Sequence, residues 1–542
     1  MNGFQLNDAM VLAQELAHAG RRTEAEQVYR AILAANPQSH PAYQELGLLA
    51  FGAGNLSMAA DLFQTAIALN GNIAHYHRSY GEICRRMGRF DTAIEAATRA
   101  CSLAPFDIDA HFNLALAFSD AKNLVAAAQA YREVLELQAP YLASSAATAR
   151  MWNMRGISLH RLDRFDEARK CYERALELQP EFAEGLNCLG SLLREIGFAR
   201  DARDCFSRAV DLAPEFSDAR LNLGMAQLYL GEWQAGWENY EARWMGSAES
   251  RNGTLARPFC PLPQWDGQGK SDQQTLLVFA EQGFGDTFQF SRYLELAAQR
   301  FAKVGFVCPV PTMHVLMEYS FGERVLLLKQ MPVDFSGWDW QCPLLSLPRA
   351  FQTRPESVPS DGPYLKVSQL ARSHWGARLD RAASQRFTVG LAWAGRRTHQ
   401  YDHRRSLRFE QLTPLLEDKR ITWVSLQKQE ADGARPVIPE GINWIDWTEE
   451  LFDFADTAAL VSNLDLVISI DSAMVHLAGG LGRPVWMLNR YDSEWRWLER
   501  REDSPWYPGL RIFNQPQFGD WTGAILAVQS ALAAVMDGYS GA

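Results

Sequence analysis

Polar side chains stand where a buried strand is expected to end. The apolar run LDLVISI (464–470) is followed by Asp471 and Ser472, and His476 comes one helical turn later in a segment of small residues. Ligands of open α/β sheets bind beyond the carboxyl ends of the strands. A helix that starts there presents unpaired N–H groups and a partial charge of about +0.5. The pattern predicts a phosphate or diphosphate site; a serine-capped helix with a buried histidine is the structural alternative.

Cationic side chains that suit a phosphate follow two other expected strands. The segment RRTHQYDHRRSL after GLAWAG holds four arginines, and a guanidinium group can contact a phosphate through two donors. We select Arg404 and Arg405, because Ser406 and Leu407 resume ordered structure behind them. Lys428 ends the run ITWVSLQK and is expected at the same edge of the sheet. A solvated charged loop and a surface lysine are the alternatives. The four arginines are Arg396, Arg397, Arg404 and Arg405.

The segment EQGFGD contains the candidate for acid–base chemistry. Asp286 lies at an expected strand-to-helix turn, where a carboxylate can take a proton from an attacking hydroxyl. Gly283 and Gly285 permit the tight turn and a close approach by a substrate. The alternative role for Asp286 is to cap the following helix.

Metal chemistry is not indicated. His399 and His403 have the spacing of a metal-binding pair, but the neighbouring Asp402 does not complete a ligand set. An Asp-x-Asp motif is absent from strand ends in the second half of the sequence. We therefore predict metal-independent chemistry without a cofactor.

The segment 491–513 is dense in aromatic and charged residues. Trp495, Arg496 and Trp497 could close over a nucleotide base or clamp two lobes together, and Trp506 with Tyr507 could do the same. Packing between the second half and the repeats described below explains the composition equally well.

The elements that must position these groups alternate between strand and helix from residue 274 onward. Apolar runs such as TLLVFAEQ and KVGFVCP predict strands, and TFQFSRYLELAAQRF between them predicts one amphipathic helix. This alternation predicts a mainly parallel sheet. The proline-rich segment 342–367 indicates a junction between two lobes, at 274–365 and 366–542. The second lobe is expected to contain a helix at FEQLTPLLED and a closing helix at 523–536.

The first half repeats itself with a period of 34 residues. Each copy carries two small residues twelve positions apart, an aromatic residue four positions later, and often a closing proline. Seven extra residues near 140–150 interrupt the period and predict a longer helix or a bend there. The aromatic positions are Tyr29, Phe63, Tyr131, Tyr172, Phe206 and Tyr240, and Ala97 is the exception.

This pattern resembles the tetratricopeptide repeat, in about seven copies over residues 1–245, with a connector at 246–273. Arrays of this kind form a groove that binds a protein partner. Asn113, Asn153, Asn187 and Asn222 are placed like the asparagine ladder of the O-GlcNAc transferase family, which implies contacts with the backbone of a protein acceptor. The alternative is that asparagine is simply common at these positions.

The motifs of the second half resemble the heptosyltransferase-type family, in the version fused to tetratricopeptide repeats. The matching segments are GFGDTFQF, GLAWAG, SLQK and DSAMVHLAGGLGRPVW. The resemblance implies an α-solenoid followed by an α/β glycosyltransferase of the GT-B fold, with two Rossmann-like lobes. It further implies a metal-independent, inverting glycosyltransferase, and protein glycosyltransferases that modify flagellin are among the similar architectures.

The resemblance also implies roles for individual residues. Asp286 corresponds to the catalytic base. Eight other residues correspond to contacts with the nucleotide sugar. The donor is either a purine-diphosphate sugar or a CMP-linked nonulosonic acid. Two other functions stay open: a non-catalytic adaptor that binds a nucleotide sugar, and a transferase that acts on glycans or lipopolysaccharide. The nucleotide-sugar positions are Gly285, Arg404, Arg405, Gln427, Lys428, Asp471, Ser472 and His476.

Composition restricts the partners and the compartment. The net charge of −11 argues against general nucleic-acid binding. Eight cysteines without a C-x-x-C pair favour a reducing compartment. The sequence shows neither a secretory signal nor a run of about 18 apolar residues, so we expect a cytoplasmic protein without a membrane span.

Overall fold

The computed structural model describes residues 3–142, 147–246, 256–269, 272–396, 402–428 and 435–539. These residues fall into two compact units. The first comprises 1–192, 205–219 and 242–256, and the second comprises 193–204, 220–241 and 257–542. Arg397 and His399 lie outside the described residues, as do parts of the expected insertion (143–146) and connector (247–255).

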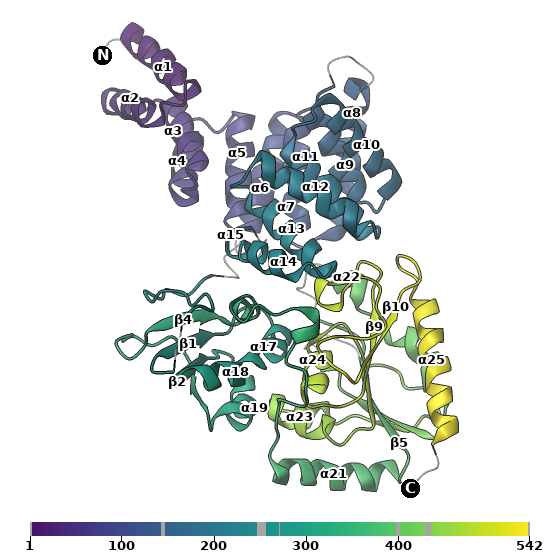
Figure 1. Ribbon diagram of the computed structural model, residues 1–542. Helices are drawn as coiled ribbons and strands as arrows, with labels where there is room; N and C mark the ends of the chain where they lie inside the picture. Colours follow the sequence, from purple (N-terminus) through teal and green to yellow (C-terminus); the bar gives the residue numbers. More distant parts are fainter. Residues whose placement is uncertain are drawn as a thin grey trace. The chain divides into compact units, whose positions relative to one another are not determined.

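Consecutive helices of the repeat region pack against one another in pairs (Figure 1). Small residues permit the close approach: a Cβ atom on Gly47 would lie 2.7 Å from the ring of Phe63, and one on Gly156 would lie 2.5 Å from the ring of Tyr172. The helices are α1 (Gly3–His18), α2 (Arg22–Ala35), α3 (His40–Gly52), α4 (Leu56–Leu69), α5 (Ala74–Arg86), α6 (Phe90–Leu103), α7 (Ile108–Asp120), α8 (Leu124–Leu142), α9 (Ala149–His160), α10 (Phe165–Leu178), α11 (Ala183–Glu195), α12 (Ala199–Leu212), α13 (Ser217–Tyr229), α14 (Trp233–Tyr240) and α15 (Arg243–Gly246).

Helix α8 is the longest of the second helices of the pairs. It spans 19 residues, compared with 14 in α6 and α10, and it contains Pro140 in its last turn. The extra residues near 140–150 therefore extend a helix, which is one of the two outcomes expected from the sequence.

The first sheet of the second unit is parallel, with strand order β3-β2-β1-β4. The single helix expected after β1 is divided in two, because the buried Arg292 ends its first part by donating from Nε to the carbonyl of Gln289 (2.8 Å). The elements are β1 (Thr275–Phe279), α17 (Phe284–Phe290), α18 (Tyr293–Arg300), β2 (Lys303–Val307), α19 (Pro311–Phe321), β3 (Val325–Leu328), β4 (Trp340–Pro343), η1 (Leu344–Ser346), α20 (Leu347–Ala350) and η2 (Pro355–Ser357).

The second sheet is also parallel, with strand order β10-β9-β8-β5-β6-β7. The segment expected as an α-helix at FEQLTPLLED is a 3-10 helix, in which Pro414 has no N–H for an α-helical hydrogen bond. The elements are α21 (Gln369–Ala383), β5 (Phe387–Ala392), α22 (Asp402–Arg405), η3 (Phe409–Glu417), β6 (Ile421–Ser425), β7 (Trp444–Ile445), η4 (Thr448–Glu450), α23 (Phe454–Val461), β8 (Leu466–Ile470), α24 (Ala473–Gly480), β9 (Val485–Asn489), η5 (Trp495–Trp497), β10 (Leu510–Asn514) and α25 (Trp521–Gly538).

Each sheet has one point at which the strand order reverses. The chain adds β2 and β3 on one side of β1 and then β4 on the other; it adds β6 and β7 on one side of β5 and then β8, β9 and β10 on the other. Open sheets bind ligands beyond the strand ends at such points. The turns that follow β1, β5 and β8 are therefore the places to look for a site.

Helix α14 belongs to the second compact unit, although its sequence is that of a repeat. The ring of Trp237 meets those of Trp495 (5.4 Å) and Phe290 (6.4 Å) edge-on, and Trp233 stacks on Trp506 (5.2 Å). The repeat pattern therefore continues to residue 245 in the sequence. Helix α14, however, packs against α17 and against the segment 491–513. One of the roles left open for 491–513, packing against repeat residues, is present.

Candidate functional site

The turns after β1 and β8 lie against each other. A Cβ atom on Gly285 would lie 2.8 Å from Cδ2 of His476 and 3.5 Å from Cα of Ala473. A larger residue at this position would displace the ring of His476. The structure therefore brings together the two segments that the sequence singled out separately, from two different sheets.

Asp286 joins the turn after β1 to η5 electrostatically. One carboxylate oxygen accepts a hydrogen bond from the N–H of Gly283 (2.9 Å) at the start of α17, and the other is paired with the guanidinium of Arg496. The Asp286 side chain is 17% exposed and the Arg496 side chain 12%. The alternative role, a helix cap, is thus present, and the same carboxylate also bridges to η5.

Arg496, which the sequence analysis singled out together with its two flanking tryptophans, has a partner that the sequence did not indicate. Its Nε donates to Oε1 of Gln289 (3.0 Å), and its guanidinium lies over the ring of Trp495. Burial alone would lower the pKa of Arg496, but Asp286, Tyr240 and further carboxylates outweigh burial and raise it. The only signal in the sequence was an arginine between two tryptophans, which does not reveal a partner about two hundred residues away.

The start of α24 has the geometry expected of a capped helix. The hydroxyl of Ser472 accepts a hydrogen bond from the N–H of Met474 (3.3 Å) and lies 3.0 Å from that of Ser469. Asp471 is buried; burial, and then the charge of Glu494, raise the pKa of its carboxyl group against the opposing effect of Arg405. Ser472 and Asp471 therefore stand at the helix start.

His476 is buried and neutral in this site. Burial, and then the charges of Arg496 and Arg292, hold its pKa well below the usual value. Nδ1 lies 2.9 Å from the Tyr507 hydroxyl, and the ring stacks on Trp497.

The hydroxyl groups around His476 form a connected hydrogen-bond network. The Tyr364 hydroxyl accepts from Arg292 (3.1 Å) and donates to the carbonyl of Phe288 (2.9 Å). The Tyr507 hydroxyl lies 3.4 Å from that of Tyr364 and 2.9 Å from Nδ1 of His476. In the tautomer in which Tyr507 donates to Nδ1, Nε2 carries the imidazole proton and can donate a hydrogen bond.

The depressed pKa of His476 makes stability sensitive to acid. Below about pH 6.5 an unfolded chain protonates this histidine and the folded site does not, so the contribution is present above that pH and is lost below it. We expect the free energy of unfolding of the wild type to fall by up to about 1.4 kcal/mol for each pH unit below 6.5 because of this histidine. The His476→Gln variant should not show this fall. Urea unfolding of both proteins at a series of pH values measures the difference. If the difference in unfolding free energy between the two proteins stays constant below pH 6.5, His476 is not a neutral buried histidine. The control is His18→Gln, because His18 is exposed.

The guanidinium group of Arg405, the last residue of α22, lies at the start of α24. Its Nη1 donates to the carbonyl of Asp471 (3.2 Å), and its Nε lies 3.3 Å from Asp402. Gly395, at the end of GLAWAG, makes room for the guanidinium group, because a Cβ atom there would lie 2.8 Å from Cζ of Arg405. Arg405 therefore reaches the predicted phosphate position from the turn after β5.

Arg404 makes different contacts from Arg405. Its Nη1 lies 2.7 Å from a carboxylate oxygen of Glu195 and 3.3 Å from one of Asp492, and these three side chains are 14%, 7% and 6% exposed. Breaking a buried pair of this kind costs several kcal/mol (about 3–5). Arg404 thus connects Glu195 to Asp492 in the turn after β9, and its contact with a phosphate stays a prediction.

Gln427 and Lys428, the last two residues of SLQK, also differ in their surroundings. Oε1 of Gln427 accepts from the backbone N–H groups of Trp393 (3.1 Å) and Ala394 (2.9 Å), so this side chain shapes the turn after β5. Lys428 is exposed, two residues beyond Leu426 at the carboxyl end of β6. Since β6 is the neighbour of β5, Lys428 extends the edge that carries Arg405.

The four asparagines occupy equivalent helices of the repeats. They lie in α7, α9, α11 and α13. Asn113, Asn187 and Asn222 are partly exposed, whereas Asn153 is buried at 7% exposure and its Oδ1 accepts no hydrogen bond within the described part of the chain. Contact with an acceptor remains a prediction for all four positions.

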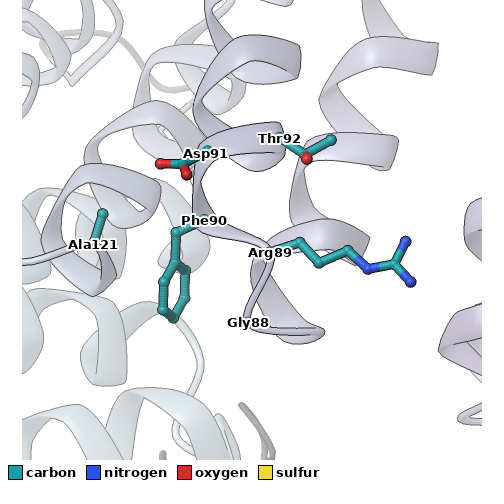
Figure 2. A pocket seen from close by; sticks show the side chains of 6 residues that line it. All are labelled: Gly88, Arg89, Phe90, Asp91, Thr92 and Ala121. Atoms are coloured by element: carbon teal, nitrogen blue, oxygen red, sulfur yellow. The ribbon is translucent and has the colours of Figure 1, made fainter.

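Two surface hollows lie away from these residues. One of 300 Å³ is formed by the turn before α6 and by Ala121, and Figure 2 shows the Arg89 side chain extending away from Asp91 there. Another, of 390 Å³, lies between Gly231–Ala235 and Arg354–Glu356. Among the residues described, no group of three His, Cys, Asp or Glu side chains is arranged to hold a metal, and none of the helices could cross a membrane.

Comparison with known families identifies the repeats. A tetratricopeptide-repeat family model matches residues 149–182, and a second tetratricopeptide-repeat model matches 44–108, 85–141 and 187–238. The first half of the chain is therefore an array of tetratricopeptide repeats, as its period predicted.

The relatives extend the comparison to the second half. Protein FlbA of Caulobacter vibrioides is 27% identical over 544 residues, a match that covers 96% of this chain and 83% of FlbA. Among solved structures, a thermophilic TPR protein of Thermus thermophilus is 18% identical with a TM-score of 0.31, covering 35% of this chain and 100% of that one. A tetratricopeptide-repeat protein of Parabacteroides merdae is 14% identical with a TM-score of 0.37, covering 46% and 97%. The chain thus contains tetratricopeptide repeats and is similar along nearly its whole length to FlbA.

Proposed function

We propose that the chain is a glycosyltransferase that moves a sugar from a nucleotide-activated donor to a Ser or Thr hydroxyl of a protein recruited by its repeats. One observation carries the proposal: the turns at the reversal points of two parallel sheets meet, with Gly285 against His476 and Asp286 joined to Arg496. Two open sheets that face each other through such turns are the arrangement of a GT-B enzyme. Similarity to FlbA across both halves supports a single functional unit.

The reaction requires one proton acceptor and a stabilised leaving group. The acceptor oxygen forms a bond to the anomeric carbon, the bond from that carbon to the phosphate oxygen breaks, and the hydroxyl proton passes to Asp286. The carboxylate lies in the first turn of α17, where one oxygen accepts from the Gly283 N–H and the other is paired with Arg496.

The negative charge that develops on the departing nucleotide needs donors in place of a metal. The N–H groups at the start of α24, the Ser472 hydroxyl and the Nε2–H of His476 supply neutral donors, and Arg405 and Lys428 supply positive charge. Asp471 and Gln427 shape the turns that present these groups. Arg404 is left out of this set.

Product analysis tests the proposal directly. The full-length protein is incubated with candidate acceptors, flagellin among them, and with a panel that includes CMP-linked nonulosonic acids and UDP-, GDP- and ADP-sugars. We expect one donor to add the mass of its sugar to an acceptor protein, detected by intact-mass spectrometry. Transfer to a glycan alone would show that the acceptor is not a protein. Nucleotide binding without any product would favour the adaptor.

Lys428 offers a binding test that leaves the fold unchanged. Because the side chain is exposed at a strand end, Lys428→Ala should lower affinity for the preferred nucleotide about tenfold without changing the melting temperature of the free protein. Thermal shift across a nucleotide titration measures both quantities. Lys419→Ala, an exposed lysine just before the other end of β6, is the matched control and should bind like the wild type. Equal affinity in both variants would remove Lys428 from the site.

A further inference from the structure

The hydroxyl of Tyr240 is not needed for the packing of its repeat. Tyr240 ends α14 and is buried, at the position where each repeat places an aromatic ring against a small residue. Phe63 and Phe206 fill the equivalent positions of other repeats, so the packing needs only the ring. In the first repeat the hydroxyl of Tyr29 is buried without a hydrogen-bond partner among the described residues.

The surroundings of Tyr240 differ from those of the other repeats. Its ring lies against Trp495 (centroids 5.4 Å apart), the residue next to Arg496. Its hydroxyl accepts a hydrogen bond from Nε2 of Gln282 (3.3 Å). Gln282 lies in the turn that carries Asp286, and its backbone has a φ of 60°. A side-chain-bearing residue adopts this left-handed conformation only when neighbouring contacts hold it there.

Among the described residues, three side-chain contacts from other segments help to hold the turn after β1. The carboxylate of the buried Glu281 accepts from the N–H of Leu345 (3.1 Å), next to the end of β4. The Gln282 side chain donates to Tyr240, and Asp286 is paired with Arg496. Tyr240 takes part directly in the second contact, and its ring lies against Trp495, over which the guanidinium of Arg496 is placed.

We propose that Tyr240, a residue of the last repeat, is a positioning residue for Asp286, acting through Gln282 and Arg496. The repeat array then supplies part of the transferase site as well as recognising the acceptor. This inference rests on the proposed function for its kinetic consequence, but the ordering of the turn can be measured independently.

Tyr240→Phe in the full-length protein tests the hydroxyl alone. We expect kcat to fall about fivefold, the effect of one hydrogen bond, with KM for the acceptor and the melting temperature unchanged. Hydrogen exchange of the peptide containing residues 281–286 should become faster at the same time. Tyr29→Phe, at the equivalent position of the first repeat, should alter none of these quantities.

A double-mutant cycle with Gln282→Ala separates positioning from general loosening. If the two side chains act on Asp286 through their mutual contact, kcat of the double variant should fall no further than kcat of either single variant. The inference would be overturned if the two reductions in kcat multiplied in the double variant. It would also be overturned if hydrogen exchange of the peptide containing residues 281–286 were as slow in Tyr240→Phe as in the wild type. A wild-type protein without transfer activity but with faster exchange in Tyr240→Phe would refute the proposed function and leave the positioning role standing.

Discussion

Asp286→Asn should abolish sugar transfer while leaving the fold and nucleotide binding in place. Asparagine has nearly the same shape and keeps an oxygen that can accept from the Gly283 N–H, but it cannot take the proton of an attacking hydroxyl. We expect kcat to fall by a factor of about 10² to 10⁴, the usual contribution of a general base. Single-turnover transfer assays and nucleotide thermal shift measure the two effects separately.

A second aspartate controls for helix capping. Asp520 caps α25 by accepting from the N–H of Gly523 (3.0 Å) and lies away from Asp286 in the sequence. Asparagine and aspartate cap helices about equally well, so Asp520→Asn should keep both stability and transfer. If Asp286→Asn retains wild-type kcat, the base lies elsewhere. Loss of folding in Asp286→Asn would instead assign the carboxylate to the Arg496 pair alone.

Arg404→Ala should cause the largest loss of stability of any variant considered. The substitution leaves Glu195 and Asp492, both less than a tenth exposed, without the cation that they share. Breaking a buried pair of this kind costs about 3–5 kcal/mol, even though Nε of Arg490 lies 3.6 Å from the other oxygen of Asp492. Urea unfolding followed by tryptophan fluorescence measures the change, since many of the tryptophans lie in the unit that contains the pair.

The matched control for Arg404 is in the same segment. Arg396 is exposed, so Arg396→Ala should change the unfolding free energy by less than about 0.5 kcal/mol. If Arg404→Ala were as stable as the wild type but failed to bind nucleotide, the arginine would be a phosphate ligand after all and the structural role would fail. Wild-type affinity in the folded variant would support the structural role of Arg404.

Local patterns in the sequence determined much of the architecture. The period of 34 residues located the repeats, because each repeat is a local unit whose small and aromatic residues serve the contact between its own two helices. The strands β1, β5, β6 and β8 were located for a similar reason: buried parallel strands are continuous apolar runs. The polar residues directly after them were thereby placed at one edge of a sheet.

Elements with weak local patterns were not found. The strands β4 and β7 are only four and two residues long, and β10 lies within a segment dominated by tryptophans and charges. The division of one expected helix into α17 and α18 depends on the burial of Arg292, which makes contacts with Trp506 and Tyr364 far along the chain. Such contacts leave no periodic trace in the sequence around them.

Adjacent residues with the same chemistry show most clearly what only the tertiary structure decides. Arg404 and Arg405 are indistinguishable in the sequence, yet one lies between Glu195 and Asp492 and the other at the start of α24. Asp286 and Arg496 could each be singled out, but their pairing could not. The sequence determines which side chains can carry charge and which segments are buried; pairing depends on long-range packing, because the energy of a charge is set by the neighbours that the fold brings within a few ångströms.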